Sequence, residues 1–511
     1  MGLAFLLLVP LMMMVMDTPE AESEELDVPE EEPEVVPDAI EETPEITRTG
    51  FTVSEDLFGA NAVYSVHTDQ GDISETFNSA LEVFEIENLR YPAGQAERGP
   101  GDQEGHEWLD ITELTEDGEL RPELTNFLDQ ANTQVTLTIP TTNAPAETYG
   151  EGLAEWAELV VREYGDQISA FEIGNEYWSR MDESEYGALA NEAILALASG
   201  IEAAGAEDPD IIVQMASCYG SSAFNSVDDE RGFIDRVTDA NYAIIDELSD
   251  EARAEVDGVV EHYYWNKSPI PFEDTSAESN YIDIDIGIWQ SEFDQDLDFH
   301  ITEWNIRMGN TPANGLLGMA VMVEMVENMV ELGVDSANVW PVIHNATTDL
   351  GGPSDDGIVQ TDDQGRVTET VRGAVFDLMA TELPGMELIQ LDIGSVQDDM
   401  EVAAYENDGE FVIYLSNTSL EPETITVDLS SIIPDFTSAE GVQVGYDPET
   451  SDGRFYKPRV GMVDAHSVLV NGEEYYLNEH DTGALLTDHT FDSSVFTISL
   501  NPHELLQITA R

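Results

Sequence analysis

From residue 51 to about 382 the chain alternates short β-rich runs with stretches whose apolar residues recur every three or four positions. Stretches of the second kind include "GLAEWAELVVREYG" (152–165) and "GLLGMAVMVEMVENMVELG" (315–333), and this periodicity is typical of amphipathic helices. Strands that alternate with helices indicate βα units around a parallel sheet. Eight units over roughly 330 residues predict a (β/α)₈ TIM barrel with insertions.

The expected barrel strands are rich in β-branched and aromatic residues and end at Gly, Pro, Asn or Asp. They cover residues 57–65, 83–94, 133–141, 168–176, 210–217, 257–265, 297–305 and 336–343. We interpret the methionines of 319–329 as one face of a helix packed on the barrel, because a methionine stripe at helical spacing is usually core. After residue 382 strand-like runs are separated by turn residues. This texture predicts an antiparallel β-sandwich over 383–511.

The N-terminal part differs from the rest. Residues 1–16 are almost continuously apolar but shorter than the ~20 residues that a membrane-spanning helix needs, and they lack a basic segment. Residues 17–50 are rich in Asp, Glu and Pro, which predicts a disordered, extended linker. An apolar end followed by an acidic tether suits a secreted or cell-surface protein, either with an atypical export signal or with an N-terminal anchor.

The charge of the chain excludes some functions. There are 107 Asp and Glu residues against 17 Lys and Arg, for a formal net charge of −90. Such a chain repels nucleic acid and anionic membranes, and it suits a protein adapted to salty water, where ions screen its self-repulsion. The single cysteine, Cys218, rules out an internal disulfide and a cysteine-built zinc site. We interpret it as a small buried hydrophobe.

Two glutamates end expected barrel strands. Glu176 follows the fourth strand in "FEIGNEYW", and Glu303 ends the seventh in "FHITEWN". The C-terminal ends of the strands face the active site of such barrels, and strands four and seven lie on opposite sides of the mouth. Two carboxylates about 5–5.5 Å apart suit double displacement at a sugar, in which one attacks the anomeric carbon and the other acts as acid and then base.

With these motifs the chain resembles the clan A retaining glycoside hydrolases. Within that clan "LRYPAG", "EHYYW" and "EWN" look most like α-L-arabinofuranosidases and β-xylosidases, with β-glucuronidase and heparanase types next. The resemblance implies Glu176 as acid/base, Glu303 as nucleophile and Asn175 as the contact to the sugar 2-hydroxyl. It also implies that Arg90 supports the nucleophile.

The resemblance further implies that the His-x-Tyr pair of the sixth strand lines the pocket near the nucleophile. We expect Arg90 beside Glu303 to keep the nucleophile ionised, and we expect Glu176, with no cation next to it in sequence, to hold its proton longer. All seven tryptophans fall in the barrel, where aromatic faces can stack on sugars. The expected substrate-binding residues are Arg90, Asn175, His262, Tyr264, Trp178, Trp304, Trp340, Asn305 and Arg307.

The chain departs from the arabinofuranosidase pattern at two places. Ala93, Gly94 and Gln95 follow the strand-two proline where the family has a second glycine and then asparagine, and Arg307 replaces a tryptophan. These changes leave the bond-breaking residues intact and leave the sugar unit open. His300 is expected to be a buried core residue, and the remaining histidines lack metal-ligand spacing.

Four of the scarce cations follow barrel strands on the expected active face: Arg98, Arg180, Lys267 and Arg307. They either bind a uronate or sulfate group of the substrate or, as the favoured interpretation, offset neighbouring acids.

The sequence therefore predicts a retaining glycoside hydrolase that acts on a polysaccharide or oligosaccharide and needs no cofactor or metal. Its partner is a carbohydrate, and neither nucleic acid nor membrane lipid is expected beyond the N-terminal segment. The alternatives are a hydrolase of uronic-acid-containing or sulfated glycans, a non-catalytic carbohydrate-binding protein, and a salt-adapted structural surface protein.

Overall fold

The structure is a computed structural model. It describes residues 46–511 except 97–107, 142–148, 207, 217–230, 266–278, 308–314, 345–347, 353, 356–357, 360, 362–363, 392–399, 431, 434–435, 458–460 and 480–481. The apolar segment 1–16, most of the acidic linker, Cys218, Arg98 and Lys267 lie outside the described residues. No helix in the described part of the chain is long and apolar enough to cross a membrane.

Eight parallel strands close into a barrel, as predicted, and each expected strand is present. In spatial order β10, β11, β2, β5, β6, β7, β8 and β9 are neighbours, and β9 pairs with β10 to close the ring. Their bounds are β2 Asp56–Asn61, β5 Asn88–Tyr91, β6 Gln134–Ile139, β7 Ile168–Ile173, β8 Asp210–Gln214, β9 Gly258–Trp265, β10 Asp298–Ile306 and β11 Ser336–Val339.

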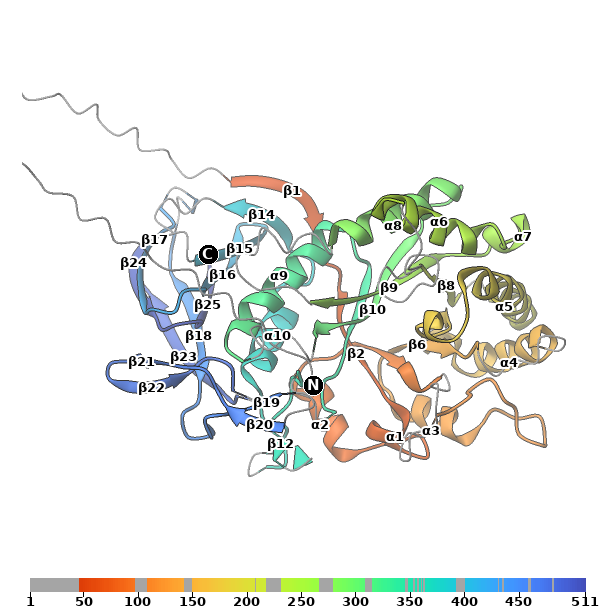
Figure 1. Ribbon diagram of the computed structural model, residues 1–511, viewed down its shortest axis with the longest axis horizontal. Coiled ribbons are helices and arrows are strands. Elements are labelled where there is room, and N and C mark those ends of the chain that lie inside the picture. Colours follow the sequence, from red (N-terminus) through yellow and green to blue (C-terminus); the bar gives the residue numbers. More distant parts are fainter. Residues whose placement is uncertain are drawn as a thin grey trace, which may run out of the picture. The chain divides into compact units, whose positions relative to one another are not determined.

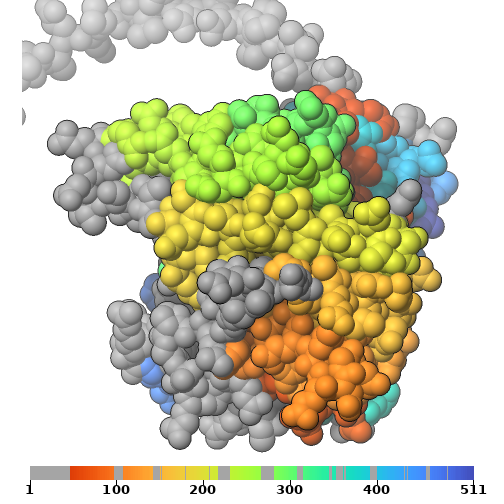
Figure 2. Space-filling model, turned by 90° about the vertical axis from the view of Figure 1, so that its right-hand side faces the viewer, coloured from red at the N-terminus to blue at the C-terminus, as the bar shows by residue number. Residues whose placement is uncertain are grey.

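Helices surround this barrel (Figure 1). The larger ones are α2 Glu75–Val83, α3 Pro122–Gln130, α4 Tyr149–Tyr164, α5 Glu183–Ala204, α6 Phe233–Ile245, α8 Ser279–Glu292, α9 Leu317–Glu331 and α10 Val371–Glu382. Figure 2 shows α4, α5 and the α6–α8 segment as adjacent layers, from orange through yellow to yellow-green, over one side of the barrel. Short elements complete this part: α1 Tyr64–His67, β3 Thr68–Asp69, β4 Asp72–Ile73, η1 Ala93–Ala96, η2 Gly165–Gln167, η3 Tyr177–Ser179, α7 Asp250–Arg253, β12 Ser354–Asp355 and β13 Ile358–Val359.

The methionine stripe lies on α9, as expected. Met319, Met322, Met325 and Met329 are fully buried in the large core that joins the barrel to its helices. A straight-chain residue fits a helix surface that is covered on nearly all sides, because methionine adapts its shape to irregular gaps. The stripe is therefore packing and not part of a binding site.

Sheet A, a seven-stranded sheet, follows the barrel in the order β1-β14-β15-β16-β25-β18-β23, and its pairs are antiparallel. Tyr405 and Tyr414 point to the barrel-side core, while the alternate residues Ala404 and Ile413 belong to a second core that includes strands β17 and β24. Helices α9 and α10 lie between the barrel strands and sheet A (Figure 1). Alternation along each strand thus produces the predicted sandwich.

The sandwich strands are β14 Glu387–Leu391, β15 Met400–Asn407, β16 Glu410–Asn417, β17 Glu423–Asp428, β18 Ala439–Tyr446, β19 Arg454–Lys457, β20 Gly461–Asp464, β21 Ser467–Val470, β22 Glu473–Tyr476, β23 Ala484–Phe491, β24 Val495–Leu500 and β25 Leu505–Ala510. The expected linker boundary at residue 50 is wrong for its last residues. Strand β1, Ile46–Thr52, pairs with β14 at the edge of sheet A. The strand is largely exposed, so its sequence lacks the alternation that marks a half-buried strand.

Candidate active site

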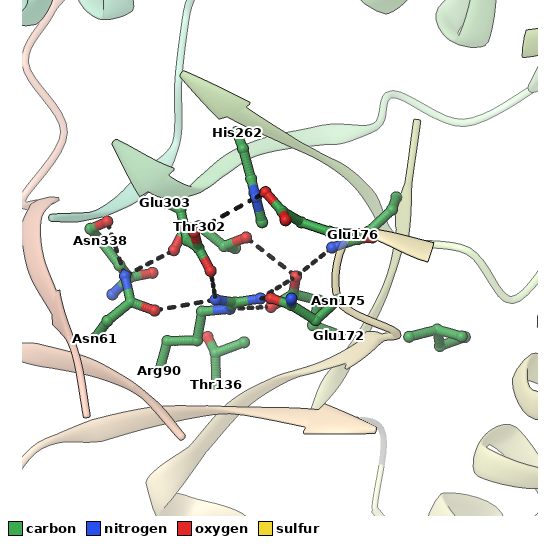
Figure 3. A network of polar contacts seen from close by, with 12 residues as sticks. Asn61, Arg90, Thr136, Glu172, Asn175, Glu176, His262, Thr302, Glu303 and Asn338 are labelled. Carbon is green, nitrogen blue, oxygen red and sulfur yellow. Dashed lines mark hydrogen bonds and ion pairs between the residues drawn. The ribbon is translucent and has the colours of Figure 1, made fainter. Parts of the chain in front are cut away.

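Five of the expected site residues meet at the C-terminal mouth of the barrel (Figure 3). Arg90 lies on β5, Asn175 and Glu176 follow β7, His262 lies on β9 and Glu303 on β10. This is the face at which such barrels place their active sites. Residues far apart in sequence are brought together because every strand of a parallel barrel ends at the same rim.

The turn after β7 aims Glu176 at the mouth. Gly174 has φ +84°, and a Cβ there would meet the Thr141 side chain at 3.1 Å, so this position requires glycine. Glu176 itself has φ 47° and ψ 48°, in the left-handed region. A non-glycine residue with positive φ is uncommon and concentrates at functional sites. The "GNE" sequence therefore ends the strand and turns a carboxylate into the pocket.

An irregularity in β10 brings Glu303 into the same pocket. Ile301 pairs with Glu261, but Glu303 pairs with His262, so the register shifts by one residue at Thr302. Strict alternation would turn residue 303 outward, on the side of Ile301. The extra residue lets Thr302 and Glu303 both face the barrel interior, where Thr302 donates a hydrogen bond to Glu172 and Glu303 accepts one from Arg90. A β-bulge commonly re-aims a side chain beside an active site.

The carboxylates of Glu176 and Glu303 lie close together at the barrel mouth. One carboxylate oxygen of Glu176, one of Glu303 and a ring nitrogen of His262 all lie within 4.8 Å of one another. The Glu176 side chain is 41% exposed and that of Glu303 is 9% exposed. Glu176 is thus open to solvent and leaving groups, while Glu303 is enclosed.

Arg90 is fully buried and organises the floor of the site. Its Nη1 donates to Glu303 Oε1 at 2.8 Å and to Asn61 Oδ1 at 3.0 Å. Its Nη2 donates to Asn175 Oδ1 at 2.7 Å and to Glu172 Oε1 at 2.9 Å, and Nε donates to Glu172 Oε2 at 2.5 Å. All five guanidinium hydrogens are therefore used. Although burial alone would lower its pKa, the charges of Glu172 and Glu303 raise the pKa of Arg90.

Glu172 is a site residue that the sequence did not reveal. It is fully buried inside the barrel and also accepts hydrogen bonds from Gln214 Nε2 at 3.0 Å and Thr302 Oγ1 at 3.1 Å. A charged residue inside the apolar run "AFEIG" is a usable signal, because a glutamate is almost never fully buried unless it is paired.

Tyr264 and Arg90 hold the two oxygens of Glu303. The Tyr264 hydroxyl donates to Glu303 Oε2 at 2.9 Å, while Arg90 contacts Oε1. Burial, with the neighbouring Glu303 charge, raises the pKa of Tyr264 well above its usual value, so the phenol remains a donor. The carboxylate is thereby fixed in orientation, as a nucleophile must be.

His262 lies between the two glutamates. Its Nδ1 is 3.3 Å from Glu176 Oε1 and 3.6 Å from Glu303 Oε2. Burial favours the neutral ring, but the charges of Glu303 and Glu176 raise the pKa of His262. For Glu176, burial is outweighed by the hydrogen bond and charge of His262, with Arg90 and Arg180, and its pKa is lowered. The expectation that Glu176 holds its proton longer is thus wrong, because β9 places His262 beside it although no cation is next to it in sequence.

Asn175 and Gly94 lie on the same side of the nucleophile. A Cβ on Gly94 would lie 3.8 Å from Asn175 Nδ2 and 3.9 Å from Glu303 Oε1. Arg90 holds the Asn175 oxygen, so its amide hydrogens are on the side of Gly94, and none of the described residues accepts from them. Gln95, in contrast, exchanges two hydrogen bonds of 2.6 Å with Ser65, one with its backbone N–H and one with its hydroxyl, and these hold its side chain against α1.

Two expected substrate contacts are wrong. Trp304 is fully buried on the outside of the barrel, where it stacks on Phe376 of α10 at 6.1 Å between ring centroids. The bulge in β10 is the reason, because the residue after Glu303 must point outward. Asn305 is fully buried and donates to the Trp340 and Thr348 carbonyls, so it supports the rim.

The other expected contacts lie at the rim. Trp178 is half-buried and meets His262 edge-on, with 5.9 Å between centroids. Trp340 is half-buried beside His344, at 5.3 Å. Arg307 is exposed after β10, and Arg180 donates to the Asn175 carbonyl at 2.9 Å. His300 is buried against Gly258 at the other end of β10, as expected.

Within the described residues, one group of His, Cys, Asp and Glu side chains is close enough together to share a metal ion. It consists of Glu176, His262 and Glu303.

No protein-family model matches the sequence, and no curated protein matches it. Similarity to solved structures extends along the chain. A family 51 α-L-arabinofuranosidase from Bifidobacterium longum aligns with 91% of this chain and 98% of its own, at 12% identity and a TM-score of 0.57. A 4-O-α-L-rhamnosyl-β-D-glucuronidase from Fusarium oxysporum covers 90% and 97%, at 11% identity and 0.53.

A glucosidase from Croceicoccus marinus aligns with 92% of this chain and 98% of its own, at 14% identity and a TM-score of 0.51. At these identities the similarity concerns the fold. The expected resemblance to clan A glycoside hydrolases is therefore confirmed as an architecture, a (β/α)₈ barrel followed by a β-sandwich.

Proposed function

We propose that the chain is a retaining glycoside hydrolase. The observation that carries this proposal is the pair of glutamates at the barrel mouth, with oxygens within 4.8 Å and one of them fixed by Arg90 and Tyr264. The spacing fits double displacement at an anomeric carbon.

In the first step a Glu303 oxygen forms a bond to the anomeric carbon while the glycosidic bond breaks. Glu176 gives its proton to the leaving oxygen, which departs as an alcohol. In the second step Glu176 takes a proton from water, the water oxygen attacks the same carbon and the bond to Glu303 breaks. The Asn175 amide hydrogens, next to Glu303, are placed to bind the sugar hydroxyl adjacent to the reacting carbon.

The proton for the first step has a defined source. Because the pKa of His262 is raised and that of Glu176 is lowered, the resting proton is held between these two groups. Substrate covers Glu176, and the bond that forms between Glu303 and the anomeric carbon removes the negative charge of Glu303. The negative charge that holds the proton on His262 is then smaller. The proton then moves to Glu176, which passes it to the leaving group.

For the sugar, we propose an arabinofuranoside or xyloside, by resemblance to the strand motifs and to one similar structure named for the first activity. Uronides and sulfated sugars are the alternative, and a chromogenic panel of arabinofuranosides, xylosides and uronides at high salt separates them. Binding without turnover on every member would instead identify a carbohydrate-binding protein.

Substitution tests the two roles. Glu303→Ala should abolish hydrolysis, and azide should restore a product of inverted configuration, because the small anion enters the space of the missing carboxylate. Glu176→Ala should lose about 10²–10⁴-fold on substrates with poor leaving groups and much less on activated ones. Glu163→Ala, at an exposed position of α4, is the control. Wild-type rates in either active-site variant would refute the assignment.

A further inference from the structure

The three groups at the barrel mouth have the separations of metal ligands. His262 Nδ1 lies 3.3 Å from Glu176 Oε1 and 3.6 Å from Glu303 Oε2. Ligands of a tetrahedral zinc ion, with bonds of about 2.0–2.2 Å, are about 3.4 Å apart. Two of the three separations are thus close to those of a bound ion. The third, between the carboxylates, is at most 4.8 Å, so a bound ion requires the half-exposed Glu176 side chain to turn toward Glu303.

The donor set selects the kind of ion. One imidazole with two carboxylates suits Zn²⁺, Ni²⁺ or Cu²⁺, whereas Mg²⁺ and Ca²⁺ prefer oxygen ligands alone. Two carboxylate charges balance a divalent ion. The half-exposed side of the cluster at Glu176, where the substrate would bind, leaves a coordination position for water.

The surroundings hold two of the ligands in place. Tyr264 donates to Glu303 Oε2 and Arg90 to Oε1, and the backbone N–H of His262 donates to Glu261 Oε2 at 2.8 Å. Outer hydrogen bonds to a carboxylate, such as the two on Glu303, orient a ligand toward a metal. Two features limit the affinity. Arg90 contributes a positive charge, and the buried Nε2 of His262 has no hydrogen-bond partner.

We propose that Glu176, His262 and Glu303 bind one zinc-like divalent ion, and that this ion inhibits the enzyme by occupying the place of the sugar. The binding site stands on geometry alone, while the inhibition rests on the proposed hydrolase function. Both carboxylates needed for double displacement become ligands, so an ion and a substrate exclude each other.

Calorimetric titration of the full chain with Zn²⁺ tests the site, in excess Mg²⁺ so that the many surface carboxylates are already occupied. We expect one Zn²⁺ per chain. His262→Asn should weaken Zn²⁺ binding by more than the 10–100-fold that loss of an outer contact causes, because an amide replaces the imidazole ligand of the cluster. His489→Asn, on β23 of the sandwich and half-buried, should bind as the parent does. Circular dichroism verifies the fold of each variant.

No zinc binding above the Mg²⁺ background, or equal binding by His262→Asn, would overturn the site. Cu²⁺ gives an independent readout, since electron paramagnetic resonance should show coupling to a single ring nitrogen that His262→Asn removes. On an active substrate Zn²⁺ should raise KM and leave kcat unchanged, and an effect on kcat alone would overturn the competition. If no substrate is hydrolysed, the proposed function fails, while the calorimetric result still decides the site.

Discussion

Replacement of Glu172 by glutamine tests whether the buried charges under the site are as tightly paired as the structure indicates. Glu172 Oε1 accepts from Arg90 Nη2, Gln214 and Thr302, and Oε2 accepts from Arg90 Nε. A glutamine has one oxygen. If that oxygen takes the position of Oε1, which accepts three hydrogen bonds, the new amide must face the Arg90 Nε–H, and two donors then meet.

The magnitude follows from these contacts. A buried donor left without an acceptor costs about 1–3 kcal/mol, and removal of one partner of a buried ion pair costs about 3–5 kcal/mol. Because Arg90 keeps Glu303 as a second partner at 2.8 Å, we expect about 2–4 kcal/mol of lost unfolding free energy for Glu172→Gln. The loss should change little with salt, since ions screen buried pairs weakly.

Urea unfolding followed by tryptophan fluorescence measures this loss at two salt concentrations. Glu163→Gln, the same exchange at an exposed site of α4, should change the free energy of unfolding by less than about 0.5 kcal/mol. Equal stability of Glu172→Gln and Glu163→Gln would show that the pairing reasoning is wrong.

Two further predictions concern the pocket and its wall. Because the raised pKa of His262 keeps the shared proton beside Glu176 to higher pH, His262→Asn should move the alkaline limb of kcat/KM to lower pH, and an unmoved limb would contradict the proton sharing. The raised pKa of His262 means that its protonated form stabilises the fold. This contribution is complete below about pH 6.5 and is lost as the pH rises through the raised pKa of the folded state. Over that rise in pH the parent protein should therefore lose more unfolding free energy than His262→Asn does. Trp304→Ala should cost about 3–5 kcal/mol of stability, whereas Trp178→Ala, at the rim, should mainly raise KM; a KM change from Trp304→Ala without lost stability would contradict its outward position.

The sequence was sufficient for the barrel because each βα unit carries its own periodicity, and for the position of Glu176 and Glu303 at the barrel mouth because both interrupt apolar runs at strand ends. It was insufficient where neighbouring strands decide the outcome. Glu172 looks like the solvent side of a half-buried strand, and only closure of the barrel buries both faces. Trp304 looks like a rim aromatic, and only the register shift against β9 turns it outward. Strand β1 is polar and exposed, so its own sequence does not identify it as a strand. Its pairing with β14 does.

The register shift in β10 also explains why the buried carboxylate of Glu261 lies next to the site. His262 lies beyond the last pair between β8 and β9, Gln214 with Val260, and beside the irregularity in β10, so its N–H has no regular ladder to join. The Glu261 carboxylate accepts this N–H at 2.8 Å. Burial raises the pKa of Glu261 to about 7, which means that burying this carboxylate in its charged form is unfavourable. Without it, the N–H of His262 would be buried and unpaired, which is also unfavourable. The position of His262 between the two glutamates therefore depends on a side chain that points away from the pocket, and the same bulge that brings Glu303 inward creates the need for it.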